Sequence, residues 1–173
     1  KNKFTMVIGG AKSGKSAFAV RLALESGKKV VYFATAKPDD PETRERILRH
    51  RSKRPPGWTT REFRMDLIAE FSAADRKSAV VIVDCLTMWL SWLLCRQGSR
   101  DSRIIDESKR LADAFSGAKA DVVLVSNEVG MSVVPANRLA RRFTDVQGVA
   151  NQIMAQAADE VYFTRAGIPA RIK

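Results

Sequence analysis

The sequence is poor in the residues that build metal clusters and disulfide frameworks. Its 173 residues include one histidine and two cysteines, Cys85 and Cys95. The cysteines have no metal-ligand spacing and lie in apolar stretches, so we expect them to be buried thiols of a cytosolic protein. Six prolines and ten glycines are spread along the chain without a low-complexity tract.

Long hydrophobic runs are also missing. The longest apolar stretch, residues 85–95, is interrupted by Thr87 and Ser91 and is too short to span a bilayer. The early apolar run, residues 4–8, is too short for a signal peptide. No repeat or linker divides the chain, and 45% of its residues are hydrophobic. These features predict a single α/β domain over residues 1–173, without a membrane span and in the cytoplasm.

Acidic residues are scarce relative to basic ones. The chain has 19 Asp and Glu against 30 Lys and Arg, a net charge of +11. Such an excess indicates negatively charged partners: nucleotides, nucleic acid or anionic surfaces. A nucleic-acid-binding ATPase stays open as an alternative, although the aromatic residues do not interleave with the basic runs as stacking platforms would.

The first motif along the chain is a glycine-rich loop that matches G-x-x-x-x-G-K-[ST]. An apolar strand, residues 4–8, precedes it and a helix-forming run, residues 17–23, follows it. Such a loop binds phosphate through backbone N–H groups; its lysine reaches the β- and γ-phosphates and its hydroxyl holds Mg²⁺. The alternative is a flexible glycine turn. The candidate nucleotide-binding residues are Gly9, Gly10, Ala11, Lys12, Ser13, Gly14, Lys15 and Ser16.

Strand and helix patterns alternate through the rest of the chain. This alternation predicts an α/β fold with a parallel sheet and right-handed crossovers. We expect strands at 29–35, 79–84 and 121–128, a short extended segment at 58–63, and a terminal hairpin from 160–164 and 168–172. We expect helices at 41–51, 65–74, 86–95, 104–115 and 137–158, the last interrupted near Gly148.

Asp84 ends an apolar strand and is the natural partner of the glycine-rich loop. A carboxylate there can hold Mg²⁺ beside the phosphates, so Ser16 and Asp84 are the candidate metal ligands. Asp84 could instead cap the apolar helix that follows. The next strand ends at Asn127 and Glu128, which could contact nucleotide or a hydroxyl acceptor.

His50 lies in a basic helical segment. The surrounding positive charge attracts phosphates and disfavours the imidazolium, which suits a nucleophile that attacks phosphorus. Spacing alone favours the alternative, a solvated basic face with an incidental histidine. A second basic cluster at Arg138, Arg141 and Arg142 could bind phosphate, a neighbouring subunit or nucleic acid. The D-x-x-G sequence at Asp145 follows a helical run and no N-K-x-D signature exists, so we discount a small-GTPase site.

Taken together, the segments resemble the bifunctional adenosylcobinamide kinase/adenosylcobinamide-phosphate guanylyltransferase family of cobalamin biosynthesis. The match spans nearly the whole chain, and Asn-Glu-Val-Gly followed by Pro-x-Asn-Arg-Leu-Ala-Arg is its most specific part. The matching residues are Gly9 to Ser16, Ala34 to Ala36, Arg46, Ile47, His50, Arg54, Pro55, Trp58, Thr60, Glu62, Asp84, Cys85, Asn127 to Gly130, Val134, Pro135, Asn137 to Arg141, Asn151, Gln152 and Ala157 to Val161.

The resemblance implies a P-loop NTPase fold of the RecA-like kind, with a mainly parallel sheet flanked by helices and a C-terminal β-hairpin. It implies that ATP or GTP phosphorylates adenosylcobinamide, and that GTP then transfers GMP to that phosphate through a guanylylated histidine. Lys15 and His50 become the catalytic residues, with Mg²⁺ as cofactor. Nucleotide contacts beyond the P-loop are Ala34, Thr35, Ala36, Arg51, Ser52, Lys53, Arg54, Glu62 and Asp84.

The resemblance also implies a homotrimer, with Trp89, Trp92 and the Asn137–Arg142 region as candidates for the subunit contact or, for the tryptophans, the core. Some family members carry two adjacent histidines where this chain has Arg49 and His50, so no alternative nucleophile is present. The alternative enzyme class is a P-loop small-molecule kinase without nucleotidyl transfer, which would not need His50.

Overall fold

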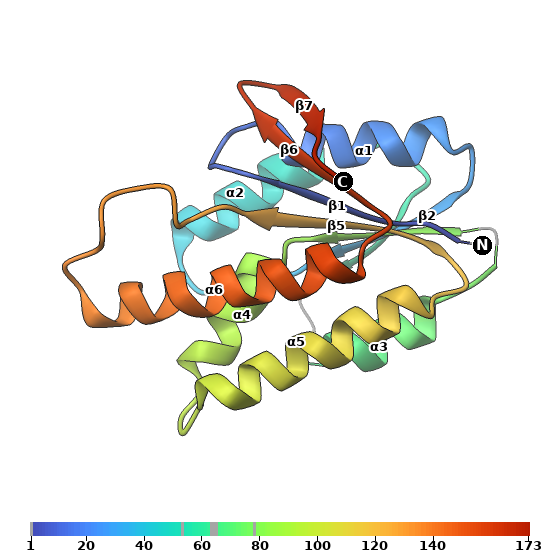
Figure 1. The fold of residues 1–173 in the computed structure, drawn as a ribbon. Helices are drawn as coiled ribbons and strands as arrows, with labels where there is room; N and C mark the ends of the chain where they lie inside the picture. Colours follow the sequence, from blue (N-terminus) through green and yellow to red (C-terminus); the bar gives the residue numbers. More distant parts are fainter. Residues whose placement is uncertain (1, 53, 63–65, 78) are drawn as a thin grey trace.

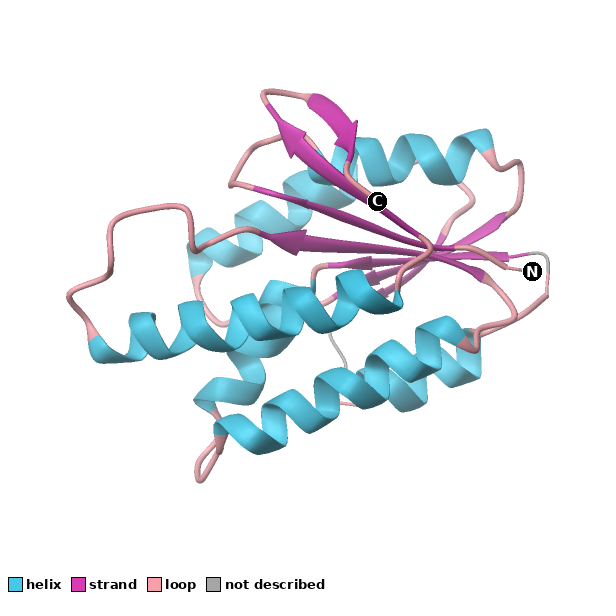
Figure 2. Ribbon diagram, viewed as in Figure 1, coloured by secondary structure: helices cyan, strands magenta, loops and turns pink. Residues whose placement is uncertain are grey.

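A computed structural model describes residues 2–52, 54–62, 66–77 and 79–173, and at positions 46 and 50 it describes the backbone. The chain forms a seven-stranded sheet with helices on both faces (Figures 1 and 2). Its elements are β1 (Phe4–Gly9), α1 (Lys15–Glu25), β2 (Lys29–Ala34), α2 (Pro41–Ser52), β3 (Thr59–Glu62), α3 (Leu67–Ala74), β4 (Ala79–Asp84), α4 (Leu86–Cys95), α5 (Asp101–Ser116), β5 (Asp121–Asn127), α6 (Arg138–Ala157), β6 (Glu160–Arg165) and β7 (Ile168–Arg171).

The strand order is β3-β2-β4-β5-β1-β6-β7. All neighbours pair in parallel except β6 and β7, which form an antiparallel hairpin. The predicted parallel sheet and terminal hairpin are therefore confirmed. Because parallel strands share one direction, the carboxyl ends of β1, β2, β4 and β5 meet at one edge, where open α/β sheets bind ligands.

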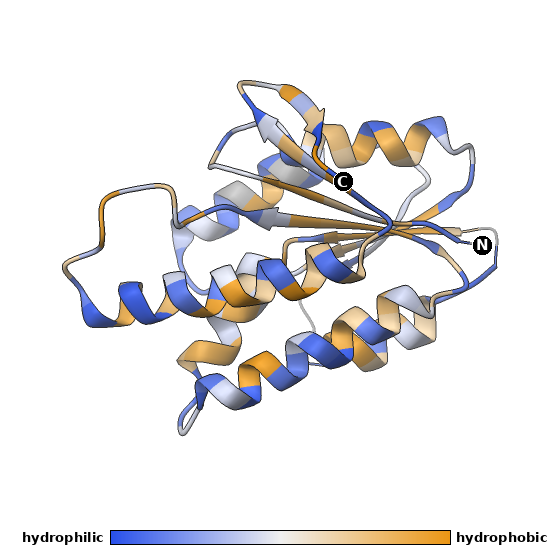
Figure 3. Ribbon diagram, in the orientation of Figure 1, coloured by the Kyte–Doolittle hydropathy of each residue, from blue (hydrophilic) through white to orange (hydrophobic). Residues whose placement is uncertain are grey.

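The strands are apolar on both faces because helices cover both. Met6 and Ile8 of β1 belong to a core that includes α3, α4, α5 and α6, whereas Val7 joins a second core with α1. The alternation follows from the two-residue period of a strand. In Figure 3 the central strands are correspondingly hydrophobic over their middle parts.

Two predicted boundaries are wrong. α6 runs without a break through Gly148, because Val146, Ala150 and Met154 bury one face of the helix, and tertiary packing outweighs the low helix propensity of one glycine. α5 begins at Asp101, so part of the predicted polar loop 98–102 is helical. The predicted start of the helix at Met65 lies outside the described residues, and α3 begins at Leu67.

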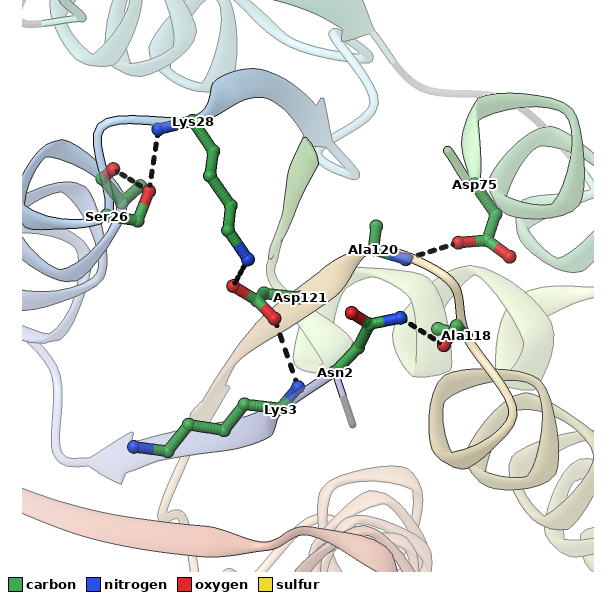
Figure 4. Close-up of polar contacts among 9 residues, drawn as sticks. Asn2, Lys3, Ser26, Lys28, Asp75, Ala118, Ala120 and Asp121 are labelled. Atoms are coloured by element: carbon green, nitrogen blue, oxygen red, sulfur yellow. Dashed lines mark hydrogen bonds and ion pairs between the residues drawn. The ribbon is translucent and has the colours of Figure 1, made fainter. Parts of the chain in front are cut away.

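A polar cluster ties the elements together at the amino-end edge of the sheet (Figure 4). The Asp121 carboxylate accepts a hydrogen bond from the Lys3 backbone N–H at 3.1 Å and forms an ion pair with the Lys28 ammonium at 2.5 Å. The Asp75 carboxylate accepts from the Ala120 N–H at 2.7 Å. These contacts join the starts of β1 and β5 to the α1–β2 turn and the end of α3, which leaves the opposite edge to the ligand-binding loops.

The β6–β7 turn packs against the glycine-rich loop. The Gly167 N–H donates to the Ser13 carbonyl at 2.9 Å. A Cβ on Gly14 would lie 3.0 Å from the Gly167 Cα, and Gly14 itself has φ +97°. The C-terminal hairpin therefore determines the shape of a loop more than 150 residues earlier, a contact that the sequence does not reveal.

Gly9 and Gly10 offer a matched test of this packing. A Cβ on Gly9 would collide with the Thr164 carbonyl oxygen, whereas a Cβ on Gly10 would meet nothing within 4 Å. We expect Gly9→Ala to lower the free energy of unfolding by ~2 kcal/mol or more and Gly10→Ala by less than ~1 kcal/mol, measured by urea denaturation. Equal effects of the two substitutions would contradict the packing described.

Candidate functional site

The predicted site residues gather at the carboxyl edge of the sheet. Ala34 lies opposite Asp84 on one side and Glu62 on the other, so the ends of β3, β2 and β4 form one row. Gly9 lies opposite Asn127 at the ends of β1 and β5. Since β5 separates β1 from β4, the glycine-rich loop and Asp84 flank Asn127.

The glycine-rich loop joins β1 to α1 as a phosphate-binding loop does. The Lys15 side chain is 7% exposed, and its ammonium donates to the Gly10 carbonyl at 2.5 Å and to the Ser13 hydroxyl at 3.5 Å. The start of α1 has no side-chain cap. Backbone N–H groups at the first turn of α1 and the Lys15 ammonium thus concentrate positive potential at the loop, as an anionic ligand requires.

Tyr32 holds the Asp84 carboxylate. The Tyr32 hydroxyl donates to Asp84, and the Arg54 guanidinium lies 4.0 Å from the centre of the Tyr32 ring. Burial, followed by the charge of Asp84, raises the pKa of Tyr32 above its usual range, so its hydroxyl stays protonated as a donor. Sequence patterns missed Tyr32, because a tyrosine within an apolar run is indistinguishable from an ordinary core residue.

Asp84 does not cap the helix that follows it. Cys85 occupies the N-cap position of α4, and no side chain there accepts a capping hydrogen bond. The alternative interpretation of Asp84 is therefore wrong. Its carboxylate is instead half-buried beside the cavity described next, as a ligand-binding role requires.

A cavity of about 80 Å³ lies between the ends of β2 and β4 and the helices α2 and α4. Four of the predicted nucleotide-binding residues line it: Ala34, Ala36, Arg54 and Asp84. Its other wall residues are Thr43, Ile47, Cys85 and Met88, of which Ile47 and Cys85 belong to the residues that carry the family resemblance. Small side chains at the end of β2 leave this space open.

Thr35 has a structural contact that the sequence did not predict. Its hydroxyl donates to the Cys85 carbonyl at 2.6 Å and accepts from the Cys85 N–H at 2.7 Å. The loop after β2 is thereby fixed to the loop after β4. The Thr35 N–H also donates to the Asp84 carbonyl at 3.0 Å, so the structure gives this buried threonine a structural role, and its nucleotide contact stays a prediction.

The remaining predicted nucleotide contacts lie at the surface near the end of α2. Arg51 and Glu62 form an exposed ion pair at 3.2 Å, and the Ser52 hydroxyl donates to the Arg49 carbonyl. Lys53 lies outside the described residues. The structure thus places Arg51 and Glu62 together, and each is exposed enough to exchange its partner for a ligand.

His50 occupies the last turns of α2. Thr43 and Ile47 of the same helix line the cavity, and at position 50 the structure describes the backbone. Asp40 begins the helix by accepting from the Thr43 N–H at 2.8 Å. The catalytic role of His50 stays a prediction.

The donor set fits Mg²⁺ better than a transition metal. Within the described ranges, no three His, Cys, Asp or Glu side chains converge as a metal cluster. One carboxylate and one hydroxyl, the ligands predicted at Asp84 and Ser16, would suit Mg²⁺, which takes its other ligands from phosphate oxygens and water.

Other predicted polar groups have partners within the chain. Glu128 accepts from the Gly130 N–H at 2.7 Å. Arg141 donates to the Pro135 and Ala136 carbonyls, and Arg142 pairs with Asp101 at 2.6 Å. Two arginines of the second basic cluster therefore anchor the start of α6. The sequence predicts Trp89 either in a subunit contact or in the core, and the structure places it in the core.

The fold and the loop together define a P-loop nucleotide-binding protein. Solved structures with this fold include the RadB recombinase, at a TM-score of 0.53 and 18% identity, covering 93% of this chain and 73% of that one. An ATP synthase subunit, NeqB from Nanoarcheaum equitans, matches at a TM-score of 0.53 and 12% identity, over 94% of this chain and 45% of that one. At these identities the likeness concerns the fold alone.

Sequence comparison identifies the family. The model described as cobinamide kinase / cobinamide phosphate guanyltransferase matches residues 5–172, and the chain belongs to this family of enzymes. The bifunctional adenosylcobalamin biosynthesis protein CobP of Pseudomonas aeruginosa is 40% identical over 97% of this chain and 96% of that protein. The bifunctional adenosylcobalamin biosynthesis protein CobU of Salmonella typhimurium is 38% identical over 97% of this chain and 98% of that protein. The predicted family is confirmed.

No helix in the described part of the chain combines the length and the apolar character that crossing a membrane requires.

The two thiols should differ sharply in reactivity. Burial raises the pKa of Cys85 to about 11, whereas Cys95 is exposed at the end of α4, so the prediction that both thiols are buried is wrong for Cys95. At pH 8 about one in a thousand Cys85 thiols is ionised, and the thiolate is the reactive form. We expect one equivalent of thiol to react with Ellman's reagent in the folded protein and a second in denaturant. In Cys95→Ser, two-step reactivity should vanish and the folded protein should be inert; a rapidly reacting Cys85 would contradict its burial.

Proposed function

We propose that the protein catalyses two successive reactions on adenosylcobinamide. In the first, ATP or GTP phosphorylates the aminopropanol hydroxyl of the substrate. In the second, GTP transfers GMP to that phosphate through a guanylylated His50, giving adenosylcobinamide-GDP. The observation that carries this proposal is the placement of the P-loop, Asp84 and the cavity-lining face of α2 around one edge of the sheet.

Both reactions are attacks at phosphorus, so the chain contributes position and charge. Lys15 and the backbone N–H groups of the P-loop would hold the β- and γ-phosphates. Mg²⁺ bound through Ser16 and Asp84 would neutralise charge on the leaving phosphate. Tyr32 supports this arrangement, because its hydrogen bond orients the Asp84 carboxylate.

In the guanylyl step, an imidazole nitrogen of His50 attacks the α-phosphorus of GTP. A nitrogen–phosphorus bond forms, the bond to the α–β bridging oxygen breaks, and pyrophosphate leaves with the electron pair. An oxygen of adenosylcobinamide phosphate then attacks the same phosphorus and releases the imidazole.

The proposal predicts that His50 is needed for guanylyl transfer alone, whereas Lys15 is needed for both reactions. We expect His50→Ala to abolish acid-labile labelling of the protein by α-labelled GTP, by at least ~100-fold, while kinase turnover stays within about threefold. Lys15→Ala should lose both reactions, because both use the P-loop. Arg49→Ala, which alters an exposed arginine paired with Glu45, serves as the control. Undiminished labelling of His50→Ala would overturn the histidine mechanism, and a wild-type protein without labelling would favour a kinase alone.

We also propose the homotrimer that the family resemblance implies. Four large apolar side chains are exposed on the β5–α6 loop and the start of α6: Met131, Val133, Val134 and Leu139. Exposed apolar residues that gather on one segment are typical of an interaction surface. We expect Val134→Asp to lower the molar mass measured by light scattering from that of a trimer towards that of one chain, without changing the far-ultraviolet circular dichroism. An unchanged mass would exclude this segment from the contact.

A further inference from the structure

Asn127 occupies the central position of the site. It ends β5, lies opposite Gly9 at the start of the P-loop, and belongs to the strand between β1 and β4. A phosphoryl group held between the P-loop and a cation on Asp84 must therefore lie over the end of β5. Asn127 is half-buried there.

The backbone of Asn127 is held from two helices. Its N–H donates to the Thr87 hydroxyl of α4 at 2.9 Å, and its carbonyl accepts from the Asn151 amide of α6 at 3.1 Å. Both of these side chains are buried. An ordinary strand end needs no such support from side chains, since turns and water satisfy its backbone groups.

The support continues into a buried polar network. The Ser126 hydroxyl donates to the Asn151 amide oxygen at 2.6 Å, and the Gln147 amide donates to both at 2.9 Å. Ser126 and Gln147 are 0% exposed. The Gln147 amide oxygen has no partner among the described residues, but the other polar side-chain atoms of the network bond to one another or to the Asn127 carbonyl. Such bonded groups hold the attached backbone in one place. The network therefore gives the end of β5 a defined position.

The side-chain amide of Asn127 differs from its backbone groups in hydrogen bonding. None of the residues that the structure describes forms a hydrogen bond with this amide, although both backbone groups of Asn127 are bonded. The fixed backbone places this amide, a hydrogen-bond donor, at the strand end beside the P-loop, where a donor can stabilise a phosphoryl group. An amide is neutral, so it does not repel the phosphates as a second carboxylate would.

We propose that Asn127 is a catalytic residue of the kinase step, whose amide N–H donates to an oxygen of the γ-phosphoryl group during transfer. This inference rests on the proposed function. The substrate hydroxyl forms a bond to the γ-phosphorus, the bond to the β–γ bridging oxygen breaks, the nucleoside diphosphate leaves with the electron pair, and the hydroxyl proton passes to solvent. Thr87 and Asn151 are positioning residues that hold the Asn127 backbone.

The two reactions should depend on Asn127 differently. Charge on the γ-phosphoryl group changes during kinase transfer, whereas in guanylyl transfer the bonds change at the α-phosphorus. A hydrogen bond accelerates the step only if it strengthens in the transition state. Asn127 should therefore matter to kinase turnover and much less to the labelling of His50.

The experiment compares Asn127→Ala with wild-type protein. We expect kcat of the kinase reaction to fall by about 30-fold or more, KM for the nucleotide to stay within about threefold, and labelling by α-labelled GTP to stay within about threefold. Asn2→Ala, at the opposite edge of the sheet, is the matched control and should leave all three unchanged. A kinase kcat within threefold of wild type, or an equal loss of both reactions, would overturn the inference.

The positioning role has its own test. Thr87→Val removes the acceptor of the Asn127 N–H, so kinase kcat should fall with little change in KM, and Thr87→Ser should restore it because the hydroxyl returns. Urea unfolding of each variant identifies any general loss of stability. Equal activity of the Val and Ser variants would exclude Thr87 as a positioning residue. The proposed function fails separately if wild-type protein takes no label from α-labelled GTP.

Discussion

The parallel pairing of β1 with β5 on one side and β6 on the other is the constraint on which the site depends. Gly9 contacts both neighbours at the carboxyl edge, lying opposite Asn127 and packing against the Thr164 carbonyl. The Gly167 N–H then fixes the next turn of the loop through Ser13. A phosphate-binding loop must hold its backbone N–H groups in one arrangement before the ligand arrives, and these two neighbouring strands supply that rigidity.

Charged side chains at this edge are held by neighbours within the chain. Lys15 is buried within the P-loop, Asp84 is held by Tyr32, and Arg54 lies over the ring of that tyrosine. Tyr32 can serve both neighbours because burial raises its pKa and preserves its proton. The excess of basic residues seen in the composition is only partly directed at ligands, since Arg141 and Arg142 anchor the start of α6 within the chain.

Much of the fold could be predicted because it depends on local patterns. Continuous apolar runs bounded by glycine and polar residues indicated β1, β2, β4 and β5, and the terminal hairpin followed from its turn. The errors concern positions where packing outweighs propensity. Gly148 stays helical because the apolar face of α6 is buried on either side of it, and α5 extends into residues whose polarity suggested a loop. The role of Tyr32 could not be predicted, because its partner Asp84 lies on a neighbouring strand 52 residues later in the chain.

The sequence by itself determined the P-loop, the carboxylate after β4 and the family, because each depends on residue types at fixed spacings along the chain. Tertiary structure decided which of these residues meet. It placed Asn127 between the P-loop and Asp84, joined Tyr32 to that carboxylate, and set the C-terminal turn against Ser13. Strand order and register create these contacts between residues tens to more than a hundred positions apart, and no local pattern encodes them.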